Sequence, residues 1–146
     1  TKIHQGKPND YFQFPNDILN KKFDGELALS KLQQYFAEEN IGNALMEKSV
    51  FVGMGDLIRT EALYRAKIHP ESLVNNIPEK KLIFLIISAV NFADELVESY
   101  KNNEFNSKAL IFEKKMCPKD KSEIQIAIST ETNRKIYICP KCQKLF

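Results

Sequence analysis

The sequence is poor in cysteine: it contains only three, all within its last 40 residues. An odd number of cysteines argues against a closed disulfide framework, which disfavours the small disulfide-stabilised class of secreted domains. Reduced thiols or a metal site in an intracellular protein fit this usage better. The start of the chain is polar and shows no signal peptide, and we therefore expect an intracellular protein.

Long hydrophobic runs are also missing. The run LIFLIISAV covers only residues 82–90, whereas a helix that crosses a bilayer needs about 20 apolar residues. We therefore expect a buried helix there and no membrane segment. Internal repeats and low-complexity tracts are absent as well. With 43% hydrophobic residues, the 146-residue chain suits one domain of typical size or two very small ones.

The chain lacks a large net charge, and its formal value of +2 indicates no particular partner. The distribution is uneven, however. Residues 107–146 hold nine of the 21 basic and four of the 19 acidic residues, which leaves twelve and fifteen for residues 1–106. This excess of positive charge predicts that an anion can be bound near the C-terminal end.

The first part of the chain is predicted to be helical after a polar start. Residues 1–22 are rich in turn formers and are interpreted as a linker or the end of a missing domain. Asp24 is a candidate N-cap for a helix, and a short helix could follow Ile41. Apolar residues with helical spacing support both helices: Leu27, Leu29, Leu32, Tyr35 and Phe36 in the first, and Ala44, Leu45 and Met46 in the second.

The stretch VGMGDLIRTEALYRAKIHP, residues 52–70, predicts a turn and a helix. Gly53 and Gly55 allow positive φ, and Asp56 suits the N-cap of a helix over 57–67 that Pro70 limits. A long helix is expected over 79–100. The apolar positions are Leu57, Ile58, Ala62, Leu63 and Ala66 in the first helix, and Leu82, Ile83, Leu85, Ile86, Val90, Phe92, Ala93 and Leu96 in the second.

After residue 106 the hydrophobic period changes from helical to alternating. We predict strands at ALIF (109–112), EIQIAI (123–128) and KIYIC (135–139), with the hairpin tip at STETN (129–133). Asn133 suits a left-handed backbone at that tip. The fold class predicted is mainly α with a small C-terminal β-hairpin. Alternation puts Ile124, Ile126 and Ile128 on one face of their strand, and Ile136 and Ile138 opposite Tyr137 on theirs.

The C-terminal residues have the spacing of a zinc ribbon in which one cysteine is replaced by aspartate. Zinc accepts a carboxylate oxygen as well as thiolates, and a proline follows the first cysteine of each pair. The alternative is a degenerate ribbon without metal, whose hairpin is held by its isoleucine face. The candidate ligands are Cys117, Asp120, Cys139 and Cys142.

Two features are candidate anion sites. Arg134 at the hairpin tip, followed by Lys135, could bind phosphate through its guanidinium fork, or it could be an ordinary solvated residue. The turn GMGD could bind phosphate at a helix N-terminus. Asp56 argues against this, because an N-cap carboxylate would satisfy the same N–H groups and repel the phosphate.

Together, these motifs resemble one family. GMGDLIRTEALYRAKIHP is similar to the helix–two-turn–helix signature of the formamidopyrimidine-DNA glycosylase and endonuclease VIII family, especially its eukaryotic endonuclease VIII-like branch. FPNDILNKKFD resembles the segment that leads into that domain, and NRKIYICPKCQ resembles the family's zinc-finger ending. The resemblance covers roughly residues 14–144. It implies a helix–two-turn–helix bundle followed by a zinc-ribbon-like finger.

The resemblance also implies base excision repair, in which a damaged base is flipped out of the duplex, its glycosidic bond is cut and the strand is nicked. The family's catalytic N-terminal Pro-Glu and its β-sandwich are absent from this chain. We therefore assign no catalytic residue and leave enzymatic activity open. The chain is either the C-terminal part of a longer enzyme or a shortened relative that only binds DNA.

Carried over by position, the resemblance assigns DNA binding to six residues and Zn²⁺ to the four ligands above. Glu61 matches a helix Glu that we expect to be structural. Asp56 departs from an expected Asn, Asp120 from a cysteine and Asn133 from a glycine. The DNA-binding candidates are Gly53, Gly55, Asp56, Arg134, Lys135 and Lys48, which could compensate for Asp56.

The domain organisation predicted is a linker (1–22), a helix–two-turn–helix domain (23–106) and a finger (107–146). The main hypothesis is a monomeric, nuclear (if eukaryotic) DNA-repair module that binds duplex DNA with a damaged base or abasic site. The alternative is a non-enzymatic module for undamaged DNA or RNA, because related helix–two-turn–helix units occur in a ribosomal protein and a topoisomerase. A third hypothesis is a degenerate protein–protein adaptor.

Overall fold

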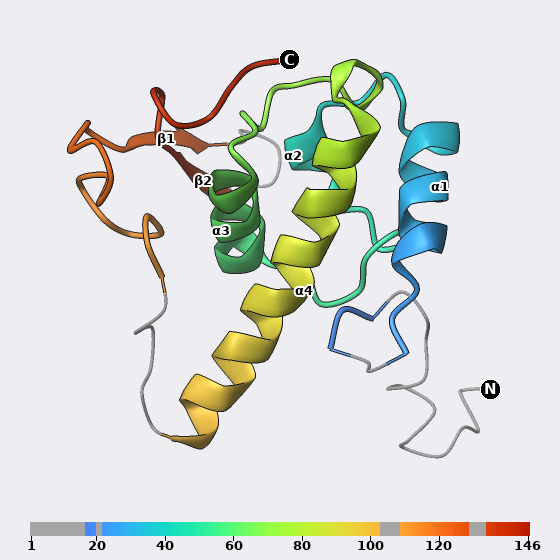
Figure 1. Cartoon of the computed structure of the whole chain (residues 1–146), viewed down its shortest axis with the longest axis horizontal. Coiled ribbons are helices and arrows are strands. Elements are labelled where there is room, and N and C mark those ends of the chain that lie inside the picture. The colour runs from blue at the N-terminus through green and yellow to red at the C-terminus, as the bar shows by residue number, and fades with distance from the viewer. Residues whose placement is uncertain (1–16, 20–21, 103–108, 129–133) are drawn as a thin grey trace.

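The computed structural model describes residues 17–19, 22–102, 109–128 and 134–146. The expected hairpin tip with Asn133, and most of the expected linker, lie outside these residues. The elements are drawn in Figure 1 and confirm a mainly helical fold with one antiparallel hairpin. They are α1 (Gly25–Tyr35), α2 (Ile41–Ala44), α3 (Asp56–Ala66), the 3₁₀ turn η2 (Val74–Asn76), α4 (Glu79–Lys101), β1 (Gln125–Ile128) and β2 (Lys135–Ile138).

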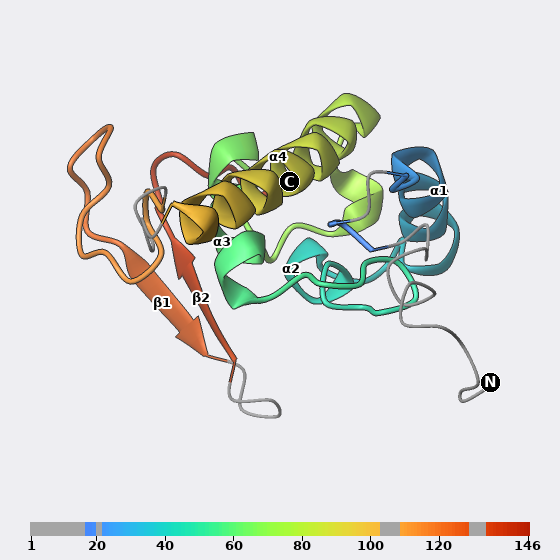
Figure 2. The same cartoon turned by 90° about the horizontal axis from the view of Figure 1, so that it is seen from below.

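The long helix α4 organises the molecule. It packs against α3 on one side and against α1 on the other, and β2 packs on α3. Figures 1 and 2 therefore show the hairpin and α1 at opposite sides of the molecule, with α3 next to the hairpin. One hydrophobic core joins the helices and β2, with Leu63, Leu85, Phe92 and Ile136 among its members. The hairpin and the helices thus share a core.

Helix α1 begins as predicted, since the Asp24 carboxylate accepts a hydrogen bond from the Leu27 backbone N–H at 3.0 Å. Its predicted apolar stripe is wrong in part. Leu32 is buried, but Leu27 is 38% and Tyr35 68% exposed, and Ala28 is buried instead. As a peripheral helix, α1 buries only a narrow face. In α4, Ile83 is likewise 41% exposed.

The predicted strand at 109–112 is wrong. The backbone N–H groups of Leu110, Ile111 and Phe112 each donate to the Glu61 carboxylate at 2.9 Å. A backbone whose donors are taken by a side chain cannot pair in a sheet. The segment is instead an anchored loop, and Ile111 lies in a second, smaller core with Tyr64.

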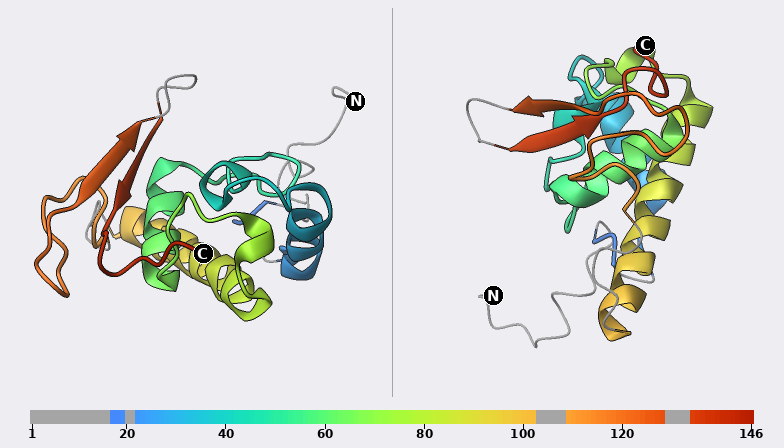
Figure 3. Two further views of the ribbon diagram at one scale, coloured as in Figure 1. Left: turned by 90° about the horizontal axis from the view of Figure 1, so that it is seen from above. Right: turned by 90° about the vertical axis from the view of Figure 1, so that its left-hand side faces the viewer.

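The hairpin has a register that separates the isoleucines of its two strands. Ile136 pairs with Ala127, whereas Ile126 pairs with Tyr137. Because directly paired residues share a face, Ile136 faces the main core and Ile126 lies on the other face. The isoleucines of the two strands therefore do not form one shared face across the hairpin. All of β1 is exposed, and Figure 3 shows it on the side of β2 away from α3.

The described helices include none that combines the length and hydropathy needed to cross a bilayer.

Candidate nucleic-acid interface and metal centre

The two glycines before α3 have different backbones. Gly53 has φ of +91°, in the left-handed region that favours glycine, and a Cβ there would lie 3.4 Å from Ile18. Gly55 is extended, with φ −113° and ψ −177°, and a Cβ there would meet nothing within 4 Å. The expected positive φ is therefore found only at Gly53, and the surface around Gly55 is open.

Asp56 is not the N-cap of α3, so that prediction is wrong. Gly55 occupies the cap, Asp56 is the first helical residue, and no side chain among the described residues caps the helix. The Asp56 Oδ1 atom accepts from Arg59 Nη2 at 3.2 Å and from Arg134 Nη1 at 3.4 Å. Two guanidinium groups thus draw the carboxylate away from the capping position. Within the part of the chain that the structure describes, the α3 N-terminus therefore keeps backbone N–H groups without a side-chain cap.

Arg59 is a buried connector that the sequence analysis did not identify. Its side chain is 7% exposed and donates to the Gly42 carbonyl at 3.0 Å, to Asp56, and to the Lys135 carbonyl at 3.4 Å. Burial lowers the pKa of Arg59, and Asp56 opposes this shift. The spacing of Asp56 and Arg59, one helical turn apart, was the available signal. Arg59 ties α2, α3 and β2 together.

The structure brings Arg134 to the N-terminus of α3. Its side chain is 47% exposed, and it immediately precedes β2. Lys135 is exposed on β2, and Lys48 is exposed in the turn after α2. Arg134 and Arg59 also line a groove of about 520 Å³ between the hairpin, α2 and the loop at His69. Arg134 and the N-terminus of α3 together form a candidate anion-binding interface.

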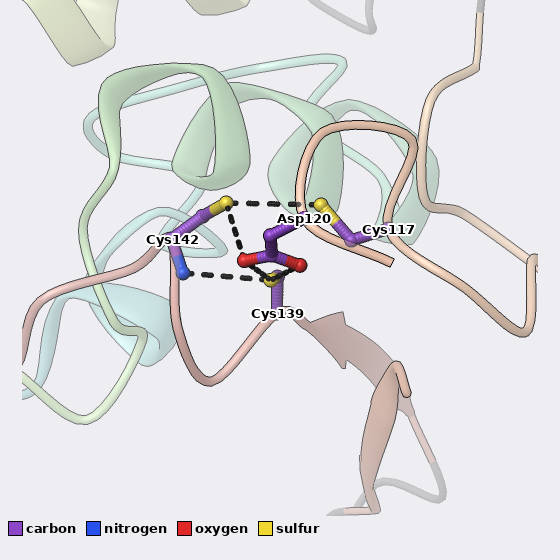
Figure 4. A group of neighbouring side chains, drawn as sticks. All are labelled: Cys117, Asp120, Cys139 and Cys142. Carbon is purple, nitrogen blue, oxygen red and sulfur yellow. Dashed lines mark hydrogen bonds between the residues drawn. The ribbon is translucent and has the colours of Figure 1, made fainter. Parts of the chain in front are cut away.

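The four predicted metal ligands converge at the base of the hairpin (Figure 4). Their ligand atoms all lie within 4.8 Å of one another. The Cys117 and Cys142 Sγ atoms are 3.7 Å apart, and Asp120 Oδ2 is 3.3 Å from Cys142 Sγ and 3.6 Å from Cys139 Sγ. A zinc tetrahedron with Zn–S bonds of ~2.3 Å has edges of about 3.8 Å. The donor set and its spacing therefore fit a tetrahedral metal ion.

Neighbouring groups orient these ligands. The backbone N–H of Ser122 donates to Asp120 Oδ1 at 2.9 Å and its hydroxyl binds the same atom, which leaves Oδ2 facing the sulfurs. These two hydrogen bonds hold the pKa of Asp120 well below its usual range. Burial, and then the hydrogen bond to Cys117, raises the pKa of Tyr64. The Tyr64 hydroxyl and Cys117 Sγ lie 3.1 Å apart and form a hydrogen bond.

The pKa values of the Cys117 and Cys142 thiols are shifted in opposite directions. Burial, followed by hydrogen bonds with Cys139 and Asp120, raises the pKa of Cys142 to about 12. Burial also disfavours the Cys117 thiolate, but hydrogen bonds from Tyr64 and from the backbone outweigh it and lower the pKa of Cys117. Metal binding here would be coupled to loss of thiol protons.

The end of the finger is fixed to the end of α3. The buried Gln143 side chain accepts from the Cys139 N–H at 2.7 Å and donates to the Ile68 carbonyl at 2.9 Å. The His69 N–H donates to the Lys144 carbonyl at 2.8 Å. The segment CPKCQ (139–143) is therefore held against residues 68 and 69, which directly follow α3.

Comparison with known proteins is consistent with this architecture. Endonuclease 8-like L720 of Acanthamoeba polyphaga mimivirus is 34% identical over 134 residues, covering 87% of this chain and 48% of that protein. The crystal structure of a viral DNA glycosylase superposes with a TM-score of 0.78 at 32% identity, covering 88% of this chain and 50% of the other.

A third likeness, at lower identity, concerns the fold alone. The Lactococcus lactis formamidopyrimidine-DNA glycosylase, solved non-covalently bound to DNA containing an AP site, has a TM-score of 0.77 at 23% identity and covers 93% of this chain and 52% of the other. The chain spans about half the length of these proteins. The family model described as the formamidopyrimidine-DNA glycosylase H2TH domain matches residues 15–107. The chain therefore belongs to the formamidopyrimidine-DNA glycosylase H2TH domain family.

Proposed function

We propose that this chain is the DNA-binding part of a DNA glycosylase and abasic-site lyase of the endonuclease VIII type. In this proposal it binds backbone phosphates of duplex DNA around an oxidised base or an abasic site. The observation that carries the proposal is the contact between Arg134 and Asp56, the first residue of α3. Two elements far apart in sequence there present positive groups to one surface.

The physical support lies in the charges of this surface. The N-terminus of an 11-residue helix carries roughly half a positive charge, and Gly55 leaves its backbone approachable. Arg134 adds a guanidinium that can bind two phosphate oxygens at once. In the proposal, Lys135 and Lys48 add electrostatic attraction, and Arg59 fixes the hairpin at the distance from α3 that a phosphate requires.

The relatives support the choice of ligand and reaction. One is described as a DNA glycosylase and another was solved with DNA containing an AP site. We assign no catalytic residue within this chain. In the proposal, catalysis belongs to a longer protein of which this chain is the DNA-binding part. Binding as a monomer, and a nuclear location if the source is eukaryotic, are part of the same proposal.

Zinc is the proposed occupant of the centre formed by Cys117, Asp120, Cys139 and Cys142. Three thiolates and one carboxylate are ligands that zinc accepts, and their separations suit a tetrahedron. Zinc would act as a structural cross-link. It would hold the loop before β1 against the segment after β2, and so keep Arg134 in its place beside α3.

The test is the salt dependence of duplex binding. Fluorescence anisotropy on a duplex with one abasic-site analogue would compare the wild type with Arg134→Ala. Loss of one phosphate contact should weaken binding about tenfold and reduce the slope of log K against log salt by about 1.

The matched control for this test is Lys80→Ala. Lys80 is exposed in the first turn of α4, the end of the helix that packs near α1, and its loss removes the same charge. We expect this control to retain most of the affinity. Equal affinity and equal salt slopes for the wild type and Arg134→Ala would refute the proposed role of the hairpin arginine.

A further inference from the structure

We propose that Asp56 is an internal competitor of phosphate, which pairs with Arg134 and must release it when the chain binds DNA. This inference rests on the proposed function, because it concerns the same surface. It assigns to Asp56 the opposite effect on affinity from that of the other candidate DNA-binding residues.

The geometry distinguishes the two arginines that share the carboxylate. Both hydrogen bonds end on the same atom, Asp56 Oδ1. Arg59 is buried and has two carbonyl partners in addition, so its position is fixed. Arg134 is 47% exposed and its distance to Asp56 is the longer one, 3.4 Å. Arg134 is therefore the partner that can leave.

A phosphate that binds Arg134 at the α3 N-terminus would come within a few ångströms of the Asp56 carboxylate. Asp56 retains 29% exposure of its side chain, and two negative charges at such a distance repel each other appreciably at a protein surface. Asp56 therefore opposes phosphate in two ways: it occupies the guanidinium and it repels the anion.

Asp56 could instead help binding by holding Arg134 in a suitable orientation. The strength of the pair argues against this. An exposed ion pair of this kind changes an equilibrium constant by a factor of about five or less, which gives little preorganisation. The repulsion acts directly on the ligand. We therefore expect removal of the charge to tighten binding.

The decisive variant is Asp56→Asn. Asparagine keeps the size of the side chain and an Oδ1 acceptor for Arg59, so the fold should be retained. It removes the charge and replaces Oδ2 with an amide donor. Anisotropy titrations on an abasic-analogue duplex should give about three- to tenfold tighter binding than wild type. Asp94→Asn, an exposed acid on α4, removes the same charge elsewhere and should give a smaller gain.

A double variant tests whether the effect passes through Arg134. In an Arg134→Ala background, Asp56→Asn should give a clearly smaller gain than it gives with Arg134 present, because only the direct repulsion of the phosphate is then removed. Unchanged or weaker binding by Asp56→Asn, or the same large gain without Arg134, would overturn the inference. If Arg134→Ala weakens binding but Asp56→Asn does not tighten it, only this inference fails. If neither the wild type nor Asp56→Asn binds duplex, the proposed function fails with it.

Discussion

Single residues at the α3 N-terminus have unequal conformational demands. Gly53 has a positive φ that favours glycine, and a Cβ there would lie 3.4 Å from Ile18, whereas Gly55 has an extended backbone that any residue can adopt. A sequence reader sees two equivalent glycines. The structure separates one glycine required by the fold from one that leaves a surface open.

A matched pair of substitutions tests this separation. Gly53→Ala should lower the free energy of unfolding by about 1–2 kcal/mol, because alanine is strained in the left-handed region. Gly55→Ala should change it by less than about 0.5 kcal/mol. If phosphate approaches the backbone there, Gly55→Ala should nevertheless weaken duplex binding.

The measurements for this pair are urea denaturation and duplex titration of both variants. Equal destabilisation by the two substitutions would contradict the assignment of the fold requirement to Gly53. Full duplex affinity of Gly55→Ala would argue against close approach of DNA at that point.

The N-cap of α3 is Gly55 and not the predicted Asp56. Asp56 directly precedes an apolar helical pattern, which is the usual signature of a capping residue. Its carboxylate instead pairs with Arg59 on its own helix and with Arg134, 78 positions away. Local rules cannot include a partner so distant in sequence. The group of Cys117, Asp120, Cys139 and Cys142 could be predicted to converge because its spacing is characteristic, and the structure brings these four side chains together.

At the scale of elements, Glu61 connects the two halves of the fold. Its side chain is completely buried in α3 and accepts the N–H groups of residues 110–112. The helices α1 and α4 could be predicted from apolar residues at helical spacing, and α3 from the glycines before it and Pro70 after it. The segment ALIF could not be assigned correctly, since an apolar run of four residues does not reveal that a carboxylate will take its donors.

Glu61→Gln should therefore loosen the finger. Glutamine offers one acceptor oxygen where two now bind three donors, and its amide hydrogens would face backbone N–H groups. We expect a loss of about 2–4 kcal/mol of stability. Chemical denaturation, with hydrogen exchange of residues 110–112, would measure it. Wild-type stability with unchanged exchange would show that the carboxylate does not anchor this loop.

At the scale of the whole molecule, the finger and the helices act as one unit. β2 contributes to the main core, Arg59 binds the β2 backbone, and Gln143 binds the end of the α3 turn. The domain boundaries at 22/23 and 106/107 stay a prediction; the family match, to residues 15–107, overlaps the first two of these segments, and Ile18 lies in the main core. Because the finger and the helices are packed together, we expect changes at the candidate metal centre to affect the surface formed by Arg134 and the N-terminus of α3.

Metal removal should consequently affect DNA binding. A strong chelator should lower the midpoint of thermal unfolding and weaken duplex binding, while the helical circular dichroism is largely retained. Asp120→Ala should lose metal more readily than wild type in competition with a chromophoric chelator, and Asp120→Cys should retain it at least as well. Metal-free protein with full stability and affinity would contradict the cross-link proposed for the centre.

The central claim is that this surface binds damaged duplex DNA, and competition among nucleic acids tests it most directly. A labelled duplex with one abasic-site analogue would be displaced by the same unlabelled duplex, by its intact counterpart, and by a structured RNA of equal length, all at one stated salt concentration. The account predicts that the abasic duplex competes best. Equal competition by intact duplex, or better competition by RNA, would contradict it and favour a general nucleic-acid-binding module.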